Sequence, residues 1–186
     1  MAITTEQIKQ LRDETGISVM QCKKALEETG GDKEKAIIIL RKQGAKTAEK
    51  KAGRSLGAGV IGSYVHAGDA IGAMVVLSCE TDFVAKNEEF KTLARDIAMQ
   101  VAAMSPKWKT MDEISENDKK AAKEVFEGEV KGKPEEIREK ILEGKLNSYF
   151  KEQVLMEQPF IKNPEITIGD LVKSCVQKFG ERTEPI

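Results

Sequence analysis

The nine residues Cys79-Glu80-Thr81-Asp82-Phe83-Val84-Ala85-Lys86-Asn87 mark the point at which the hydrophobic pattern of this 186-residue chain changes its period. Before them, apolar residues alternate along residues 70–79, as in a β-strand with one buried face. A second β-rich run, residues 60–66, precedes that strand across an Ala-Gly-Asp turn. After the nine residues, the apolar side chains follow a helical spacing: Phe90, Leu93, Ala94, Ile97, Ala98, Val101 and Ala102. The pattern predicts an α+β core, with a small antiparallel sheet packed on helices.

The connection between strand and helix allows two interpretations. Thr81 or Asp82 could cap a turn while Phe83 points into the core. Alternatively, an aromatic ring beside a carboxylate at a loop tip suits protein recognition, because the ring can fill a pocket while the acid meets its polar rim. Spacing alone leaves both interpretations open.

The first 43 residues predict three short helices that form a bundle. Thr4 and Gln7 fit a capping box at the start of the first helix, and Ser18 with Gln21 repeats the arrangement at the second. Asp32 suits the cap of the third helix, which we expect to end near Gln43-Gly44. Residues 44–56 are then expected to form a basic linker helix, with the core domain in residues 57–186.

Charge is distributed unevenly, although the formal net charge is only -1. Residues 1–56 contain 12 basic and 8 acidic side chains, so an excess of positive charge at the N-terminus balances an acidic remainder. Residues 41–54 hold six basic side chains and one acid. This segment is expected to be a solvated helix.

The C-terminal half predicts mainly charged helix. The helical pattern runs from about residue 113 to 157, with an interruption near Gly132-Lys133-Pro134. Pro159 and Pro164 then indicate a bend, and a last helix is expected over residues 168–179.

Several classes of protein are disfavoured by composition. His66 is the only histidine, so multi-histidine metal sites are excluded, and a histidine-based catalytic dyad or triad would have to use this residue. The three cysteines lie far apart, as in proteins of a reducing compartment. Residues 57–62 fit G-x-G-x-x-G, but a basic helix precedes them and a strand follows, which is the wrong context for a dinucleotide. Neither a signal peptide at Met1-Ala2-Ile3-Thr4 nor a membrane-length apolar run is present in the sequence.

Several motifs together resemble the bacterial elongation factor Ts family in its short form. The nine-residue run 79–87 looks like the family's signature. Leu11-Arg12-Asp13-Glu14-Thr15-Gly16 and Met20-Gln21-Cys22-Lys23-Lys24-Ala25-Leu26 are similar to its ubiquitin-associated-like three-helix domain. Gly31-Asp32, the basic segment 46–53 and Glu157-Gln158-Pro159-Phe160 also match, in order along nearly the whole chain.

The resemblance implies a cytoplasmic guanine-nucleotide exchange factor for elongation factor Tu, with no cofactor and no enzymatic reaction of its own. It assigns Thr81, Asp82, Phe83 and Val84 to displacement of the magnesium ion bound with GDP. Arg12, Met20 and Lys23 correspond to positions that dock on the GTPase, although the two basic residues also suit a solvated helix face.

Oligomeric state follows from the same resemblance. Short members of the family form homodimers, which implies a two-plus-two complex without direct contact to nucleic acid or membrane. Their final basic, aromatic strand is not recognisable in Glu181-Arg182-Thr183-Glu184-Pro185-Ile186. We therefore expect the third strand of the sheet to be missing.

Three rival functions are compatible with parts of the sequence. The bundle would suit a receptor for ubiquitin-like domains. The basic segment 41–54 would suit an RNA-binding protein, whose affinity would fall steeply with salt. A small enzyme is disfavoured by the single histidine.

Overall fold

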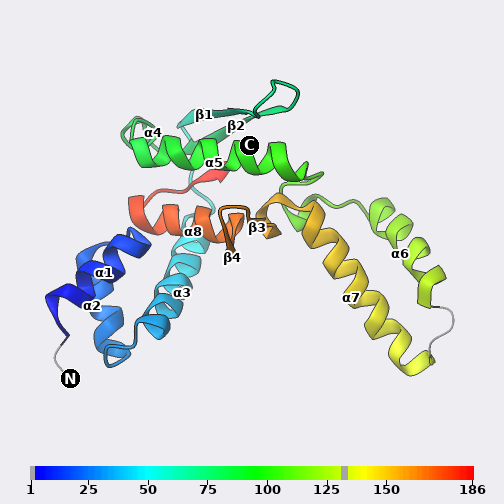
Figure 1. Ribbon diagram of the computed structural model, residues 1–186, viewed down its shortest axis with the longest axis horizontal. Helices are drawn as coiled ribbons and strands as arrows, with labels where there is room; N and C mark the ends of the chain where they lie inside the picture. Colours follow the sequence, from blue (N-terminus) through cyan, green and yellow to red (C-terminus); the bar gives the residue numbers. More distant parts are fainter. Residues whose placement is uncertain (1–2, 131–133) are drawn as a thin grey trace.

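The computed structural model describes residues 3–130 and 134–186 of the chain. Figure 1 shows an elongated molecule, with the N-terminal helices at one end and a helical hairpin at the other. The sheet and its covering helices lie between these two ends. Both helix and antiparallel sheet are present, so the α+β prediction is confirmed.

The N-terminal module consists of α1 (Thr5–Thr15), α2 (Val19–Glu28) and the first part of α3 (Lys33–Lys51). The predicted caps are present. The amide of Gln7 donates to the Thr4 hydroxyl at 3.2 Å, and the Thr4 amide donates back to the Gln7 side chain at 2.9 Å. A single small core holds the three helices together: Leu11, Ile17, Cys22, Ala25, Leu26, Ala36 and Leu40.

Helix α3 differs from the prediction, because it continues through Gly44 to Lys51 instead of ending near Gln43. The prediction of a separate linker helix over residues 44–56 is therefore wrong. Gly44 lies where α3 packs against α8 (Ile168–Phe179), and a Cβ atom there would come within 2.8 Å of the Gln177 side-chain oxygen. The glycine that suggests a helix end instead lies at a close crossing of two helices, where an added Cβ would displace the end of the Gln177 side chain.

The sheet has the strand order β1-β2-β5. Strands β1 (Ala58–Val65) and β2 (Gly72–Cys79) pair antiparallel, and the two-residue β5 (Glu184–Pro185) pairs with the other edge of β2. Val76 and Ile186 exchange two further backbone hydrogen bonds, of 2.8 and 3.3 Å. The expectation that the third strand is missing is therefore wrong, because the last residues occupy the free edge of β2.

Helix α5 (Glu88–Met104) covers the inner face of β1 and β2, and α8 packs beneath it (Figure 1). The core between them includes Val75, Leu77, Phe90, Ala94, Ile97 and Val172. Gly62 of β1 lies so close to α5 that an added Cβ would be 2.2 Å from the Ala94 carbonyl oxygen. The apparent nucleotide motif thus leads into a strand, as predicted, although β1 begins already at Ala58 and includes Gly59 and Gly62. Gly62 is needed for close packing on α5.

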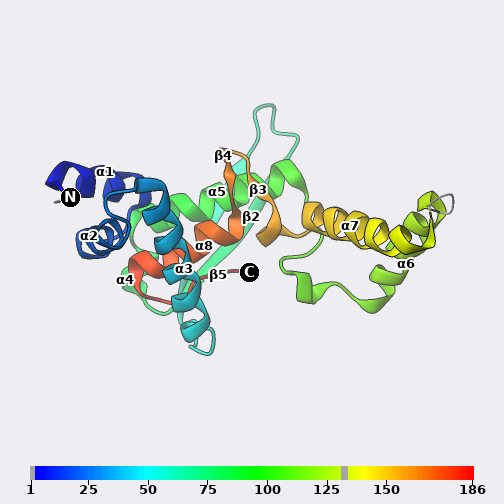
Figure 2. The same ribbon diagram turned by 90° about the horizontal axis from the view of Figure 1, so that it is seen from below.

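The helical hairpin consists of α6 (Glu116–Val130) and α7 (Glu135–Gln153), which project away from the sheet (Figure 2). The predicted interruption at Gly132-Lys133 lies outside the described residues, and Pro134 stands directly before α7. At the base of the hairpin are η1 (Met111–Glu113) and η2 (Leu155–Glu157). Strands β3 (Pro159–Phe160) and β4 (Asn163–Thr167) form the predicted bend, and α8 matches its predicted bounds.

Candidate docking site

The short helix α4 (Asp82–Ala85) places two side chains of the candidate site at the surface. Phe83 is 83% exposed, and the Asp82 carboxylate is similarly open, with one ion pair of 3.5 Å to Lys86. We call Asp82 and Phe83 the tip. The interpretation in which Phe83 points into the core is wrong.

The other half of α4 faces inward. Val84 and Ala85 are buried in the core between β2, α5 and α8. Val84 is thus not part of the exposed surface, and its side chain anchors the turn on which the tip stands. Burial on one side of a four-residue helix leaves the opposite side, with Asp82 and Phe83, directed to solvent.

Thr81 stands at the cap position of α4, but its hydroxyl caps no amide of the helix. That hydroxyl instead donates a hydrogen bond of 2.6 Å to Glu181, which follows α8. The other carboxylate oxygen of Glu181 accepts the backbone amides of Glu80 at 3.1 Å and Thr81 at 3.0 Å. The turn before the tip is thereby fastened to a residue one hundred positions away.

Glu80 makes the reciprocal contacts. Its carboxylate accepts the backbone amide of Arg182 at 2.6 Å and the guanidinium of Arg54 at 3.1 Å, and these hydrogen bonds lower the pKa of the Glu80 carboxyl. We call Arg54, Glu80, Thr81, Glu181 and Arg182 the clasp. The clasp is not predictable from the sequence, because no local pattern connects residues 54, 80 and 181.

The basic segment 41–54 is partly engaged with the core. Lys51 donates to the Gly180 carbonyl at 2.5 Å, and Arg54 belongs to the clasp. The expectation of a solvated helix is therefore wrong at Lys51 and Arg54. Lys51 and Arg54 are two of the six basic residues of this segment, and these contacts leave them unavailable to a free basic surface.

The three docking residues expected on the N-terminal module are exposed. Arg12 lies on α1, whereas Met20 and Lys23 lie one turn apart on α2. Met20 is 76% exposed, and Lys23 forms only a loose ion pair of 3.7 Å with Glu27. Figures 1 and 2 show α1, α2 and α4 at the same end of the molecule.

One side chain connects this module to the tip region. Lys178 of α8 lies against Gly16, at the end of α1, and pairs with Glu89 in the first turn of α5. Because α5 begins three residues after α4 ends, the module and the tip are supported by the same part of the core.

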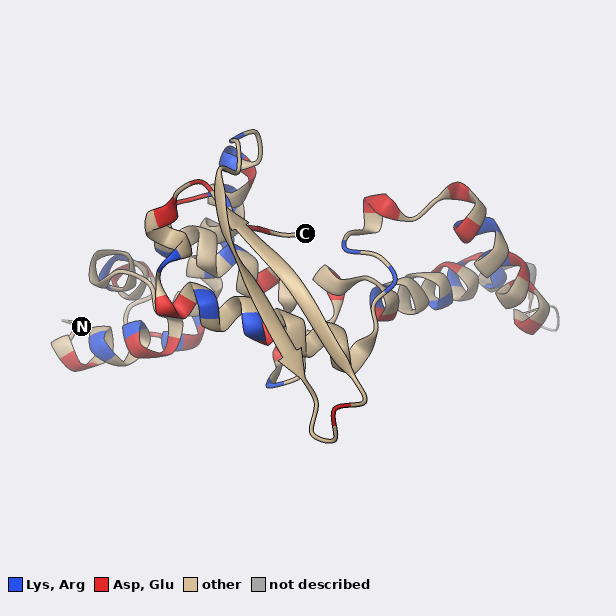
Figure 3. Cartoon of the chain, turned by 90° about the horizontal axis from the view of Figure 1, so that it is seen from above, with Lys and Arg blue, Asp and Glu red and all other residues tan. Residues whose placement is uncertain are grey.

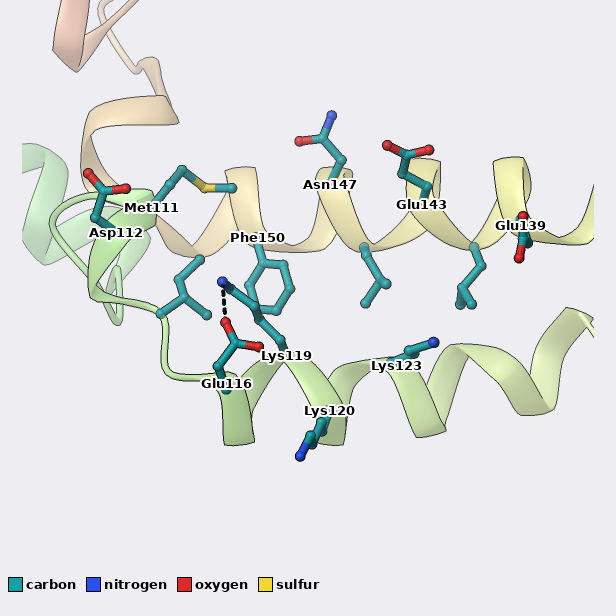
Figure 4. Close-up of a pocket in the computed structure, with 13 residues that line it drawn as sticks. Met111, Asp112, Glu116, Lys119, Lys120, Lys123, Glu139, Glu143, Asn147 and Phe150 are labelled. Atoms are coloured by element: carbon teal, nitrogen blue, oxygen red, sulfur yellow. Dashed lines mark hydrogen bonds and ion pairs between the residues drawn. The ribbon is translucent and has the colours of Figure 1, made fainter.

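A large groove, of about 910 Å³, lies between α6 and α7 (Figure 4). Ile114, Leu142, Leu146 and Phe150 contribute apolar surface, while charged side chains of both signs surround it, including the Lys119–Glu116 pair at 2.8 Å. The groove is at the opposite end of the molecule from the tip (Figure 1). It is therefore separate from the candidate docking site.

The outer face of the sheet is a further apolar surface. Ile61 and Val65 of β1, Met74 and Val76 of β2, and the terminal Ile186 are all exposed. In Figure 3 the two long strands are tan along their length, which marks residues other than Lys, Arg, Asp and Glu. Neighbouring residues pair across the strands, Ile61 with Val76 and Ser63 with Met74, so the patch is continuous.

The remaining reactive residues are structural or exposed. Burial raises the pKa of all three thiols, that of Cys175 to about 12, and the Cys79 thiol donates to the Thr81 carbonyl at 3.2 Å. His66 is an exposed residue beside the hairpin turn. Within residues 3–130 and 134–186, no three histidine, cysteine, aspartate or glutamate side chains could together hold a metal, and no helix has the length and apolarity to cross a membrane.

An exposed aromatic ring and carboxylate, held from behind by hydrogen bonds, indicate a protein-docking factor. Comparison with known proteins gives the family. The family model described as Elongation factor TS matches residues 45–182. The chain belongs to the elongation factor Ts family.

Individual relatives agree over nearly the full chain. The elongation factor Ts of Thermodesulfovibrio yellowstonii is 52% identical over 97% of this chain and 91% of its own length. That of Thermosipho melanesiensis is 49% identical over 96% of this chain and 92% of its own length, and that of Carboxydothermus hydrogenoformans is 48% identical over 96% and 83%.

Proposed function

We infer that this chain, as a member of the elongation factor Ts family, is a guanine-nucleotide exchange factor for elongation factor Tu in translation elongation. The observation that carries the proposed site is the exposure of Phe83 beside Asp82 on an anchored turn. In this proposal the protein displaces a ligand and changes no covalent bond, so it is not an enzyme. Its proposed location is the cytoplasm.

The tip would act on the magnesium ion bound with GDP. Magnesium requires near-octahedral coordination at about 2.0–2.1 Å, so a small displacement of its ligands weakens binding. A Phe83 ring inserted between elements of the partner would produce such a displacement, and the Asp82 carboxylate would bind at the edge of the pocket. Each tenfold acceleration of GDP release requires a barrier lower by about 1.4 kcal/mol, which lies within the range of one buried aromatic anchor.

The exchange factor must also bind the nucleotide-free GTPase more tightly than the GDP complex. By thermodynamic linkage, GDP and the exchange factor then weaken each other's binding by the same factor. Contacts to the GTPase outside the nucleotide site would supply affinity in both states. We assign this part to the ubiquitin-associated-like N-terminal module, through Arg12, Met20 and Lys23.

The proposal is tested by timing the release of a fluorescent GDP from elongation factor Tu. Wild-type protein is expected to accelerate release, whereas Phe83→Ala and Asp82→Ala should each reduce the maximum rate at least tenfold. Met104→Ala is the matched control, because Met104 is an exposed apolar residue at the far end of α5. Normal acceleration by Phe83→Ala would exclude the proposed role of the tip.

The N-terminal contacts predict a different kinetic change. Met20→Ala and Lys23→Glu are expected to raise the half-saturating concentration of the exchange factor with little change in the maximum rate. A fall in the maximum rate alone would contradict the docking role. Binding of a ubiquitin-like domain, or of RNA with a steep salt dependence, would instead favour the rival functions.

A homodimer is proposed on the outer face of the sheet, where Ile61, Val65, Met74, Val76 and Ile186 leave an apolar surface for a second copy. Two copies would then bind two molecules of elongation factor Tu, without direct contact to nucleic acid or membrane. Met74→Lys should convert the dimer to a monomer in sedimentation velocity, whereas Val125→Lys on α6 should not. A monomeric wild-type protein at micromolar concentration would rule out this assembly.

A further inference from the structure

The tip can act on a partner only if it keeps its orientation when pressed against that partner. Phe83 stands on a helix of four residues, whose inward side chains Val84 and Ala85 are small. The preceding residues Glu80 and Thr81 have left the sheet, so β-pairing does not hold them. The Thr81 carbonyl accepts the Ala85 amide at 3.2 Å, whereas the backbone amides of both residues are bound by a side chain.

Glu181 supplies three of the hydrogen bonds that hold this turn, beside those of the Glu80 carboxylate to Arg182 and Arg54. Its carboxylate accepts two successive backbone amides, at 3.1 and 3.0 Å, and the Thr81 hydroxyl at 2.6 Å. Gly180, with φ of +70°, directs the chain out of α8 so that Glu181 reaches the turn.

We propose that Glu181 is a positioning residue for exchange, which holds residues 80 and 81 so that Phe83 meets the GTPase in a fixed orientation. This inference rests on the proposed function of the tip. A loop that must become ordered in the complex spends part of its binding free energy on that ordering, whereas a loop already ordered does not. Glu181 therefore acts through the backbone of the turn, and touches neither the nucleotide nor the metal ion.

Two substitutions separate position from charge. Glu181→Asp keeps the negative charge but shortens the side chain by one carbon–carbon bond, about 1.5 Å, so it cannot reach the two amides. Glu181→Gln removes the charge but keeps the length, and its carbonyl oxygen can still accept both amides. Thr81 can then accept a hydrogen bond from the new amide group.

The experiment measures GDP release from elongation factor Tu over a range of exchange-factor concentrations. Glu181→Asp is expected to lower the maximum rate about tenfold, equivalent to about 1.4 kcal/mol, with the half-saturating concentration within about twofold of wild type. The maximum rate with Glu181→Gln should be within about twofold of that with wild-type protein. Amide hydrogen exchange of Glu80 and Thr81 in the free protein should be at least tenfold faster in Glu181→Asp only.

Four outcomes would overturn the inference. The first is a maximum rate of GDP release with Glu181→Asp equal to that with wild-type protein, while Phe83→Ala is slow. This outcome would leave the proposed function of the tip intact. A defect in Glu181→Gln as large as in Glu181→Asp would assign the effect to charge. A fall in the unfolding midpoint of more than about 5 °C in Glu181→Asp would indicate a general role in stability. If Phe83→Ala accelerates GDP release as well as wild-type protein does, the proposed function of the tip fails, and the inference fails with it.

Discussion

The side-chain amide of Gln100 donates a hydrogen bond of 3.1 Å to the side-chain oxygen of Gln158, and both residues are fully buried. Gln100 also donates to the Pro159 carbonyl at 3.1 Å and accepts the Ile161 amide at 3.0 Å. Gln158 donates to the Glu152 carbonyl at 2.8 Å. The pair thus fastens α5 to the segment at the base of the α6–α7 hairpin.

Gln100→Leu is expected to lower the free energy of unfolding by about 2–3 kcal/mol, because the new side chain leaves buried partners without hydrogen bonds. Urea denaturation followed by circular dichroism measures the change. The double variant Gln100→Leu/Gln158→Leu should lose less than the sum of the two single variants, since the two side chains share one network. Strict additivity would show that the network does not act as a unit.

Gly62→Ala should lower the free energy of unfolding by at least about 1–3 kcal/mol, the range typical of an overpacked core. An added methyl carbon would lie 2.2 Å from the Ala94 carbonyl oxygen and 2.3 Å from the carbonyl carbon, and these two atoms belong to the backbone. Gly144→Ala is the matched control in α7, because no atom of the described residues lies within 4 Å of its added Cβ.

The control substitution should raise stability by about 0.5–1 kcal/mol, since alanine favours a helix over glycine. Thermal unfolding of the two variants gives opposite shifts if the close approach of β1 and α5 is correct. Equal shifts of the same sign would contradict it.

The buried thiols predict a dependence on alkaline pH. Burial raises the pKa of Cys175 from its ordinary value of 9.0 to about 12, so the native state favours the protonated thiol. Its contribution to stability is fully present below about pH 9 and is lost as pH rises through 12. The unfolding free energy of Cys175→Ser should therefore fall less steeply than that of wild type between about pH 9 and 11.

Thiol labelling offers an independent measurement. Cys22, Cys79 and Cys175 are all buried with raised pKa values, so a disulfide reagent at pH 8 should modify them only as the protein opens. Addition of urea should accelerate the reaction at all three. Rapid labelling of native protein would contradict their burial.

Local signals predicted much of the fold. Thr4, Ser18 and Asp32 cap the helices that their spacing indicates, because a cap depends only on the next three residues. The β1–β2 hairpin and α5 follow from hydrophobic periods of two and 3.6, which the same few residues contain. The motif at residues 81–84 could likewise be found from adjacent residues.

Errors arose where a distant contact overrides a local preference. Gly44 is a poor helix residue, but its crossing with α8 keeps α3 continuous. The short segment Glu184–Pro185 has little strand propensity, yet the open edge of β2 pairs with it. Exposure of Phe83 and burial of Val84 could not be assigned, since periodicity is not readable in a four-residue helix.

The family, the helix starts, the hairpin and the residues of the tip can be recognised from the amino-acid sequence, because all of these depend on neighbours along the chain. The contacts that hold the tip in place become visible only in the folded molecule. Glu181 reaches Thr81 across one hundred residues, and Gln100 reaches Gln158 across 58. A hydrogen bond requires two groups to lie within about 3 Å, and for groups so far apart in the chain only the packing of α5, α8 and β2 brings them together.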